Sequence, residues 1–104
     1  MTDGNAALIA LSDPTRRAIL EKLRQGPRAV GEIASGMPVS RPAVSQHLKV
    51  LKESGLVAET RAGTRHYFVL APAGLGELRA YLDGLWGDAL AAFAAHVAKV
   101  AADD

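Results

Sequence analysis

The chain of 104 residues is 49% apolar and 22% charged, which suits one soluble domain over residues 1–104 and leaves no room for a second core. It contains no cysteine, which excludes disulfides and thiolate metal sites, and it lacks both an export signal and an apolar run of about 18–20 residues, so we expect a cytoplasmic protein with no membrane contact. The net charge is only +1, yet ten Lys or Arg against four acidic residues lie between Pro14 and His66, which indicates that the middle of the chain meets a polyanion.

Two helices are predicted at the start of the chain. Residues Asn5–Leu11 form a short apolar helix. Asp13 followed by Pro14 is typical of an N-cap with proline at the first helical position, where its missing N–H costs nothing. The second helix therefore begins at Pro14, and Gly26-Pro27 ends it.

The next segment predicts two helices joined by a brief turn. A helix of about two turns around Ile33 ends at Gly36, and Ser40 then caps a stronger helix, with Gly55 at its left-handed C-terminal position. Within the stronger helix one buried stripe is formed by Val44, Leu48 and Leu51. Two helices joined by so short a turn are typical of a helix-turn-helix.

A hairpin follows. Leu56–Arg61 and His66–Leu70 predict two strands, because they flank a turn over Ala62–Arg65 in which Gly63 supplies a positive φ. The predicted fold class is therefore mainly α with one small β-hairpin.

The last element is a long amphipathic helix. It opens at Pro72, and large apolar residues recur every three or four positions from Leu75 to Val100. This stripe is either half of a dimer interface or a lid over the chain's own core. Trp86, Leu90 and Phe93 favour the dimer, because so small a domain has too few elements to cover them and an exposed stripe would aggregate.

Four segments of the sequence resemble motifs of a known protein family. They are LSDPTRRAIL at Leu11–Leu20, AVSQHLKVL at Ala43–Leu51, GLV at Gly55–Val57 and the pattern Arg61-x-Gly63-x-Arg65-x-Tyr67. In this order, across residues 6 to 100, they resemble the ArsR/SmtB family of bacterial winged helix-turn-helix repressors. The resemblance implies a homodimer built from the first and last helices, a recognition helix at Ser40–Ser54 in the major groove, a hairpin wing beside it, and repression by occlusion.

The polar face of the recognition helix is predicted to read DNA. With the apolar stripe inward at about 100° per residue, Gln46 and Lys49 lie on the opposite face, with Arg41 beside them. Gln46 suits adenine, Arg41 suits guanine or a phosphate, and Lys49 suits a phosphate. The predicted DNA-binding residues are Ser40, Arg41, Pro42, Ser45, Gln46, His47, Lys49, Arg61 and Arg65.

Some of these residues have a simpler interpretation. His47 borders the apolar stripe and is either a packed, hydrogen-bonded histidine or a phosphate contact. Arg61 and Arg65 flank the hairpin turn and project towards the DNA backbone or minor groove, or they are solubilising charges on an exposed strand. The polar helix face itself is, in the alternative, the solvated side of a structural bundle.

The predicted dimer interface and metal site follow from the resemblance. The interface consists of Leu8, Leu11, Leu78, Leu82, Leu85, Trp86, Ala89, Phe93 and Val97. Family members commonly sense metals through cysteines before the recognition helix, or through Asp and His on the final helix. Here Asp83 and His96 fit two positions of the latter pattern, but Leu85 and Lys99 occupy the other two, which makes a poor zinc site. We therefore expect no metal and no cofactor.

The sequence thus predicts a sequence-specific homodimeric repressor that binds a double-stranded operator and regulates its own operon. No nucleophile–base pair, carboxylate cluster or phosphate loop occurs, so no enzyme is expected. One alternative is a repressor that responds to a metal or small ligand bound between the C-terminal helices. Another is a protein-interaction module on the same scaffold.

Overall fold

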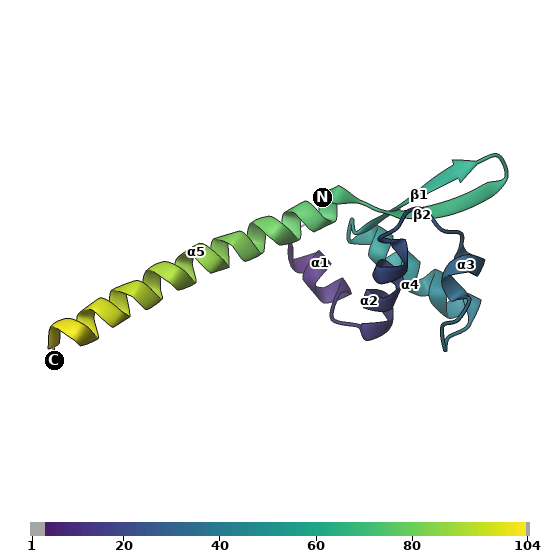
Figure 1. Cartoon of the computed structure of the whole chain (residues 1–104). Helices are drawn as coiled ribbons and strands as arrows, with labels where there is room; N and C mark the ends of the chain where they lie inside the picture. The colour runs from purple at the N-terminus through teal and green to yellow at the C-terminus, as the bar shows by residue number, and fades with distance from the viewer. Residues whose placement is uncertain (1–3, 104) are drawn as a thin grey trace.

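The computed structural model describes residues 4–103, which form five helices and one antiparallel hairpin (Figure 1). The elements are α1 (Gly4–Ala10), α2 (Pro14–Leu23), α3 (Val30–Ala34), α4 (Arg41–Glu53), β1 (Val57–Ala62), β2 (Arg65–Leu70) and α5 (Pro72–Asp103). This order confirms the predicted fold class. Helices α1 to α4 and the hairpin pack together, and α5 projects away from them, so that the molecule measures 68 × 28 × 21 Å.

The start of α2 is held by the predicted cap. Asp13 has an extended backbone, and its carboxylate accepts hydrogen bonds from the amides of Thr15 (2.8 Å) and Arg16 (3.0 Å). Pro14 stands in the first turn, where no N–H is needed. Arg16 also closes the preceding helix, because its Nε donates to the carbonyl oxygen of Ala10 at 2.6 Å. One short segment therefore fixes the junction between α1 and α2.

Because the Asp13 carboxylate caps α2, we expect the free energy of unfolding to depend on pH. The hydrogen bond from the Arg16 amide is the main cause that lowers the pKa of the Asp13 carboxyl below its ordinary value of 3.8. The stabilisation is therefore complete above pH 3.8 and is lost as the pH falls through the lower folded-state pKa. Asp13→Asn keeps a capping oxygen that does not titrate. In urea unfolding at fixed protein concentration, we expect the wild type to be the more stable protein at neutral pH and its advantage to shrink below pH 3.8. An advantage that is constant with pH would contradict this prediction.

The helix-turn-helix is formed by α3, a turn and α4. The α3 helix is shorter than predicted, because the backbone already becomes extended at Ser35. Lys22 of α2 ties down the turn, since its Nζ donates to the Ser35 carbonyl oxygen at 2.6 Å. The predicted cap of α4 is confirmed by a hydrogen bond of 3.3 Å from the Ala43 amide to Ser40 Oγ. Gly55 follows α4 with φ +78°, the left-handed conformation that a helix end favours.

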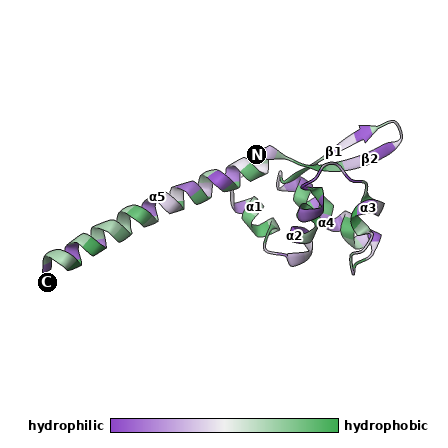
Figure 2. Cartoon of the chain, in the orientation of Figure 1, coloured by the Kyte–Doolittle hydropathy of each residue, from purple (hydrophilic) through white to green (hydrophobic). Residues whose placement is uncertain are grey.

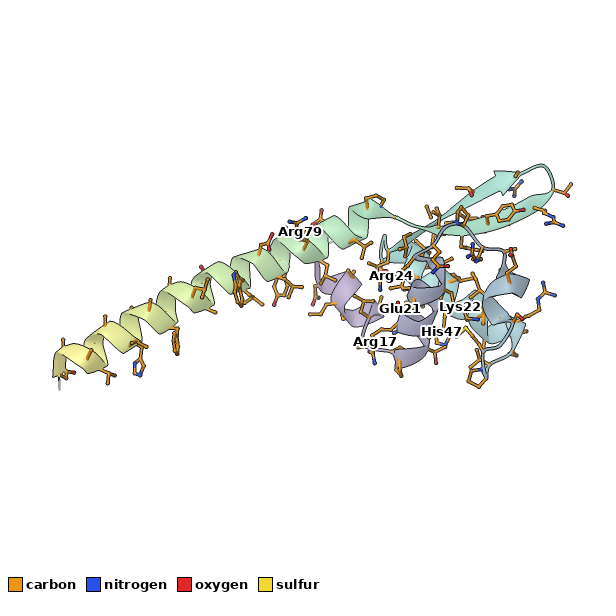
Figure 3. The ribbon with its side chains drawn as sticks, in the orientation of Figure 1. Arg17, Glu21, Lys22, Arg24, His47 and Arg79 are labelled. Atoms are coloured by element: carbon orange, nitrogen blue, oxygen red, sulfur yellow. The ribbon has the colours of Figure 1, made fainter. Side chains whose placement is uncertain are left out.

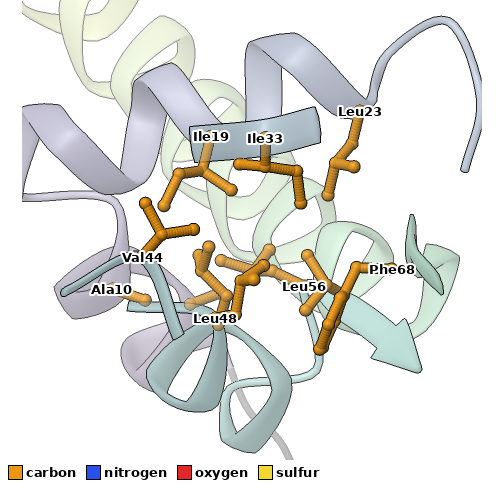
Figure 4. Packing of buried hydrophobic residues seen from close by; sticks show 11 residues of the cluster. Ala10, Ile19, Leu23, Ile33, Val44, Leu48, Leu56 and Phe68 are labelled. Atoms are coloured by element: carbon orange, nitrogen blue, oxygen red, sulfur yellow. The ribbon is translucent and has the colours of Figure 1, made fainter. Parts of the chain in front are cut away.

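The core lies between α1, α2, α3, α4 and the base of the hairpin (Figure 4). The predicted stripe of α4 is buried, with Val44, Leu48 and Leu51 exposing no more than 1% of their surface. The remaining core residues are Ala7, Ala10, Ile19, Leu23, Ile33, Leu56, Val57 and Phe68. Burial of each large side chain contributes about 1.5–3 kcal/mol. The core therefore fixes which side of α4 faces inward and which faces solvent.

The hairpin is longer and its turn tighter than predicted. Ala62 and Arg65 form the last pair of the ladder, which leaves a turn of Gly63 and Thr64 with Gly63 at φ +65°. The predicted turn over Ala62–Arg65 was therefore too long, because a two-residue loop matches the twist of the strands. Arg28 forms an isolated antiparallel bridge at the edge of β2, since its amide and carbonyl exchange hydrogen bonds of 3.0 and 2.8 Å with Phe68.

Only the start of α5 contacts the rest of the chain. Gly74 is buried, and Leu78 packs partly against the core. Every residue from Arg79 to Asp103 is exposed. Figure 2 shows apolar residues along most of the projecting part. By helical periodicity the large ones share one face, and the opposite face carries mainly alanine and glycine together with Asp88. The helix is thus less amphipathic than predicted. None of the helices described has an apolar stretch long enough to cross a membrane.

Candidate nucleic-acid interface

The exposed face of α4 carries most of the predicted DNA-binding residues. Because the apolar stripe is buried, Arg41, Pro42, Ser45, Gln46 and Lys49 are all exposed. Ser40 is exposed at the N-terminus of α4, where its hydroxyl caps the Ala43 amide. The structure therefore brings these side chains together on one polar surface, which we call the α4 face.

A residue that the sequence analysis missed makes room for Arg41. The guanidinium group of Arg41 folds back against α3, and a Cβ placed on Gly31 would lie 2.8 Å from its Nη2 atom. Any side chain at position 31 would push Arg41 away from this position. Gly31 and Arg41 lie ten positions apart in the sequence, on either side of the turn. No local sequence pattern at Gly31 predicts that they approach each other.

His47 lies at the edge of the α4 face. It is half-buried, and its charge contributes to lowering the pKa of Asp13, which places it towards the start of α2. The hydrogen bond from the Arg16 amide is the larger cause of that shift. In Figure 3 the labelled side chains of α2 and His47 lie over the packed body, whereas Arg79 stands apart on α5. A half-buried side chain at this edge is compatible with both interpretations of His47, so its contact with DNA stays a prediction.

The two predicted arginines of the hairpin lie on opposite faces. Arg61 pairs with His66 across the ladder, and Arg65 pairs with Ala62, so neighbouring pairs point to alternate sides. Both arginines are exposed beside the turn. Side-chain hydrogen bonding with Tyr67, on the same face, raises the pKa of Arg65. Each hairpin face thus carries one permanent positive charge near its tip.

An unpredicted set of ionisable side chains connects α4 to the hairpin. Glu59 of β1 lies 3.9 Å from Lys52 Nζ and 3.7 Å from His66 Nδ1. The three side chains are partly exposed, so each pairing is weak. Together they span the space between α4 and both strands. Lys49, by contrast, forms no ion pair within residues 4–103, and Glu53 lies one turn after it without pairing.

The predicted metal candidates lie apart. Asp83 pairs weakly with Arg79, with 3.8 Å between Oδ2 and Nε. His96 follows 13 positions later on the same straight helix, which corresponds to a rise of about 20 Å. Within the described part of the chain no three His, Cys, Asp or Glu side chains come together as metal ligands. One chain alone therefore brings these two residues to no common site.

The predicted dimer residues fall into two groups. Leu11 and Leu78 pack partly against the chain's own core. The others are exposed: Leu8, Leu82, Leu85, Trp86, Ala89, Phe93 and Val97. Ile9, Tyr81 and Leu90 are exposed large apolar residues that the predicted set omitted. Trp86 and Phe93 expose 68% and 69% of their surface, far more than an isolated soluble chain usually leaves open in one stripe.

Comparison with known proteins places these features in context. Residues 13–59 match the family model described as bacterial regulatory protein, arsR family. The chain is 59% identical over 85 residues to the HTH-type transcriptional regulator Rv2034 of Mycobacterium tuberculosis, covering 82% of this chain and 79% of that protein. It is 39% identical over 66 residues to the transcriptional repressor SdpR of Bacillus subtilis, covering 64% of this chain and 73% of that repressor.

Solved structures give the same result. A crystal structure of a possible transcriptional regulator for arsenical resistance is 41% identical and superimposes with a TM-score of 0.71, over 86% of this chain and 94% of the other. The solution structure of a homodimeric winged helix-turn-helix DNA-binding domain, Mb0332 from Mycobacterium bovis, is 33% identical with a TM-score of 0.64, over 81% of this chain and 78% of the other. Both likenesses extend well beyond the helix-turn-helix.

Proposed function

Because this chain belongs to the ArsR family of DNA-binding transcriptional regulators, we propose that it is a homodimeric repressor that recognises a specific operator through the α4 face and the hairpin of each subunit. The observation that carries the proposal is the orientation of α4, whose apolar side is buried while its polar side is open. The similar protein SdpR is named a transcriptional repressor, which supports repression as the outcome of binding.

The chemistry of the α4 face suits a major groove. Gln46 offers an amide that can bond adenine bidentately, and Arg41 can bond the O6 and N7 atoms of guanine. Ser45 lies between them and can donate or accept. The hydroxyl of Ser40 and the ammonium of Lys49 suit phosphate oxygens, which fix the register of the helix on the duplex.

The hairpin extends the contact beyond the groove. Arg61 and Arg65 stand near its tip on opposite faces, so the hairpin offers a charge to either side when it lies over the backbone. Arginine suits a narrow minor groove and phosphates alike. These contacts add affinity without choosing a base sequence.

Two subunits are required for a palindromic site. The proposed dimer pairs the α5 stripe with the same stripe of a second copy and covers Trp86 and Phe93, which are open in the single chain. The homodimer reported for the similar Mb0332 domain supports this assembly. The two α4 helices then enter successive major grooves about 34–36 Å apart. Binding beside its own promoter would make the protein an autoregulator, which footprinting on the DNA upstream of its gene tests.

Substitutions on the α4 face test the proposal. We expect Gln46→Ala to weaken binding to an operator selected from random duplexes by about 5- to 150-fold, which corresponds to about 1–3 kcal/mol, and to relax base preference. We expect Lys49→Ala to weaken binding to operator and scrambled duplexes equally and to lower the salt slope by about 1. Fluorescence anisotropy over a salt series measures both effects.

A matched control distinguishes loss of a DNA contact on the α4 face from a general effect of removing a glutamine side chain. Gln25→Ala removes the same side chain from an exposed position outside α4 and the hairpin and should leave binding unchanged. Equal affinity of the wild type for operator and scrambled duplexes, independent of salt, would contradict sequence-specific binding. Unchanged function after reversal of the charges at Arg41, Lys49 and Arg65 would favour a protein-interaction module instead.

A further inference from the structure

A cavity of about 380 Å³ lies between α4, the inner face of the hairpin and the start of α3. Its volume falls in the lower part of the range of small-ligand pockets. The wall on the α4 side carries Ser45 and Lys49, one helical turn apart. The other side is lined by Val30 of α3 and by the inner face of the hairpin, where Phe68 lies beside Glu59 and His66. The cavity thus offers polar groups from α4 and the hairpin and an apolar patch formed by Val30 and Phe68.

The positive charge inside the cavity is not neutralised. Glu59, the acidic residue of its lining, faces both Lys52 at 3.9 Å and His66 at 3.7 Å. Lys49 has neither an ion pair nor a hydrogen bond in the described part of the chain, and the Ser45 hydroxyl has no partner there either. An ammonium and a hydroxyl at this spacing can together hold one carboxylate.

The apolar patch is rigid and well placed for the rest of a ligand. Phe68 is mostly buried, and its backbone is held on both sides, by the ladder to Glu59 and by the two hydrogen bonds to Arg28. Val30 begins α3 and packs partly against the core. A phosphate of DNA would use the charge but not this patch. A free positive charge beside an apolar surface favours a ligand that has both a negative group and an apolar body.

We propose that this crevice binds a small amphipathic monocarboxylate, its carboxylate on Lys49 and Ser45 and its apolar body against Val30 and Phe68. Since both polar residues belong to the α4 face, a seated ligand prevents that face from contacting DNA. This consequence rests on the proposed function, whereas ligand binding itself does not. The crevice is then an effector site that competes directly with the operator.

Binding is tested on the DNA-free protein with three probes at constant ionic strength. Phenylacetate carries both features of the ligand, phenylacetamide lacks the charge, and inorganic phosphate lacks the apolar body. We expect phenylacetate to shift the amide resonances of Val30, His66 and Phe68 saturably, and the other two probes to bind at least about tenfold more weakly. No saturable shift with phenylacetate would overturn the proposal. Equal binding of phosphate at the same residues would also overturn it and identify a simple anion site.

Two variants locate the ligand within the crevice. Lys49→Gln should weaken phenylacetate binding about tenfold or more, whereas Lys99→Gln, the same change on the exposed part of α5, should not. Val30→Phe fills the apolar side and should abolish phenylacetate binding while leaving operator binding intact. Retained phenylacetate binding in both Lys49→Gln and Val30→Phe would overturn the proposal.

Competition separates this inference from the proposed function. In the wild type, saturating phenylacetate should lower operator affinity, and in Val30→Phe it should have no effect. If phenylacetate binds but operator affinity stays the same, effector competition is refuted while the ligand site stands. If the protein fails to bind any operator, the proposed function is refuted, and the ligand measurements on free protein still decide the site.

Discussion

Phe93→Arg should convert the protein to a monomer and lower its operator affinity by about 100-fold or more. Phe93 exposes 69% of its surface in the single chain and lies on the same face of α5 as Trp86. Pairing of α5 with its copy would bury a guanidinium at this position without a partner, which is costly. A monomer reaches only one half-site, and the loss of the linked second contact reduces affinity by about 10²- to 10⁴-fold.

Ala91→Arg is the matched control for this prediction. It adds the same charge two positions away, on the alanine face of α5, about 160° around the helix. Sedimentation should give twice the chain mass of 10.9 kDa for the wild type and for Ala91→Arg, and a single chain mass for Phe93→Arg. Circular dichroism checks that helix content is retained. A dimeric Phe93→Arg with full operator affinity would refute the α5 interface.

Local chemistry explains why the order of elements could be predicted. The caps at Asp13 and Ser40 and the left-handed Gly55 each act within a few residues of their own position, so short patterns reveal them. The buried stripe of α4 repeats with the helical period for the same reason. These features are sufficient to place α2, α4 and the exposed side of α4 from the sequence alone.

Contacts between distant segments could not be predicted in this way. The Lys52–Glu59–His66 charges meet only because the hairpin folds back over α4, and Arg28 pairs with Phe68 across 40 positions of sequence. Neither contact has a periodic or local pattern. The crevice between α4 and the hairpin depends on both, so it becomes visible only in the folded chain.

Gly74 is the clearest example of such a distant constraint. It lies one turn into α5, and its amide donates to the Gly55 carbonyl oxygen at 2.8 Å. A Cβ on Gly74 would overlap that carbonyl group and lie 2.8 Å from the carbonyl oxygen of Ser54. Both obstacles are backbone atoms, which cannot rotate away as a flexible side chain can. The end of α4 and the start of α5 therefore approach so closely that only glycine fits between them.

Gly74→Ala should consequently lower the free energy of unfolding by about 1–3 kcal/mol, because the inserted methyl forces the two segments apart. Helix propensity alone predicts the opposite sign, since alanine favours a helix by up to about 1 kcal/mol over glycine. Gly76→Ala provides the comparison: a Cβ there meets no atom within 4 Å, so it should stabilise the protein. Urea unfolding at one protein concentration measures both variants, because dimer stability depends on concentration. If the two substitutions change stability in the same direction, the close approach of Gly74 to Gly55 does not govern how α5 is anchored.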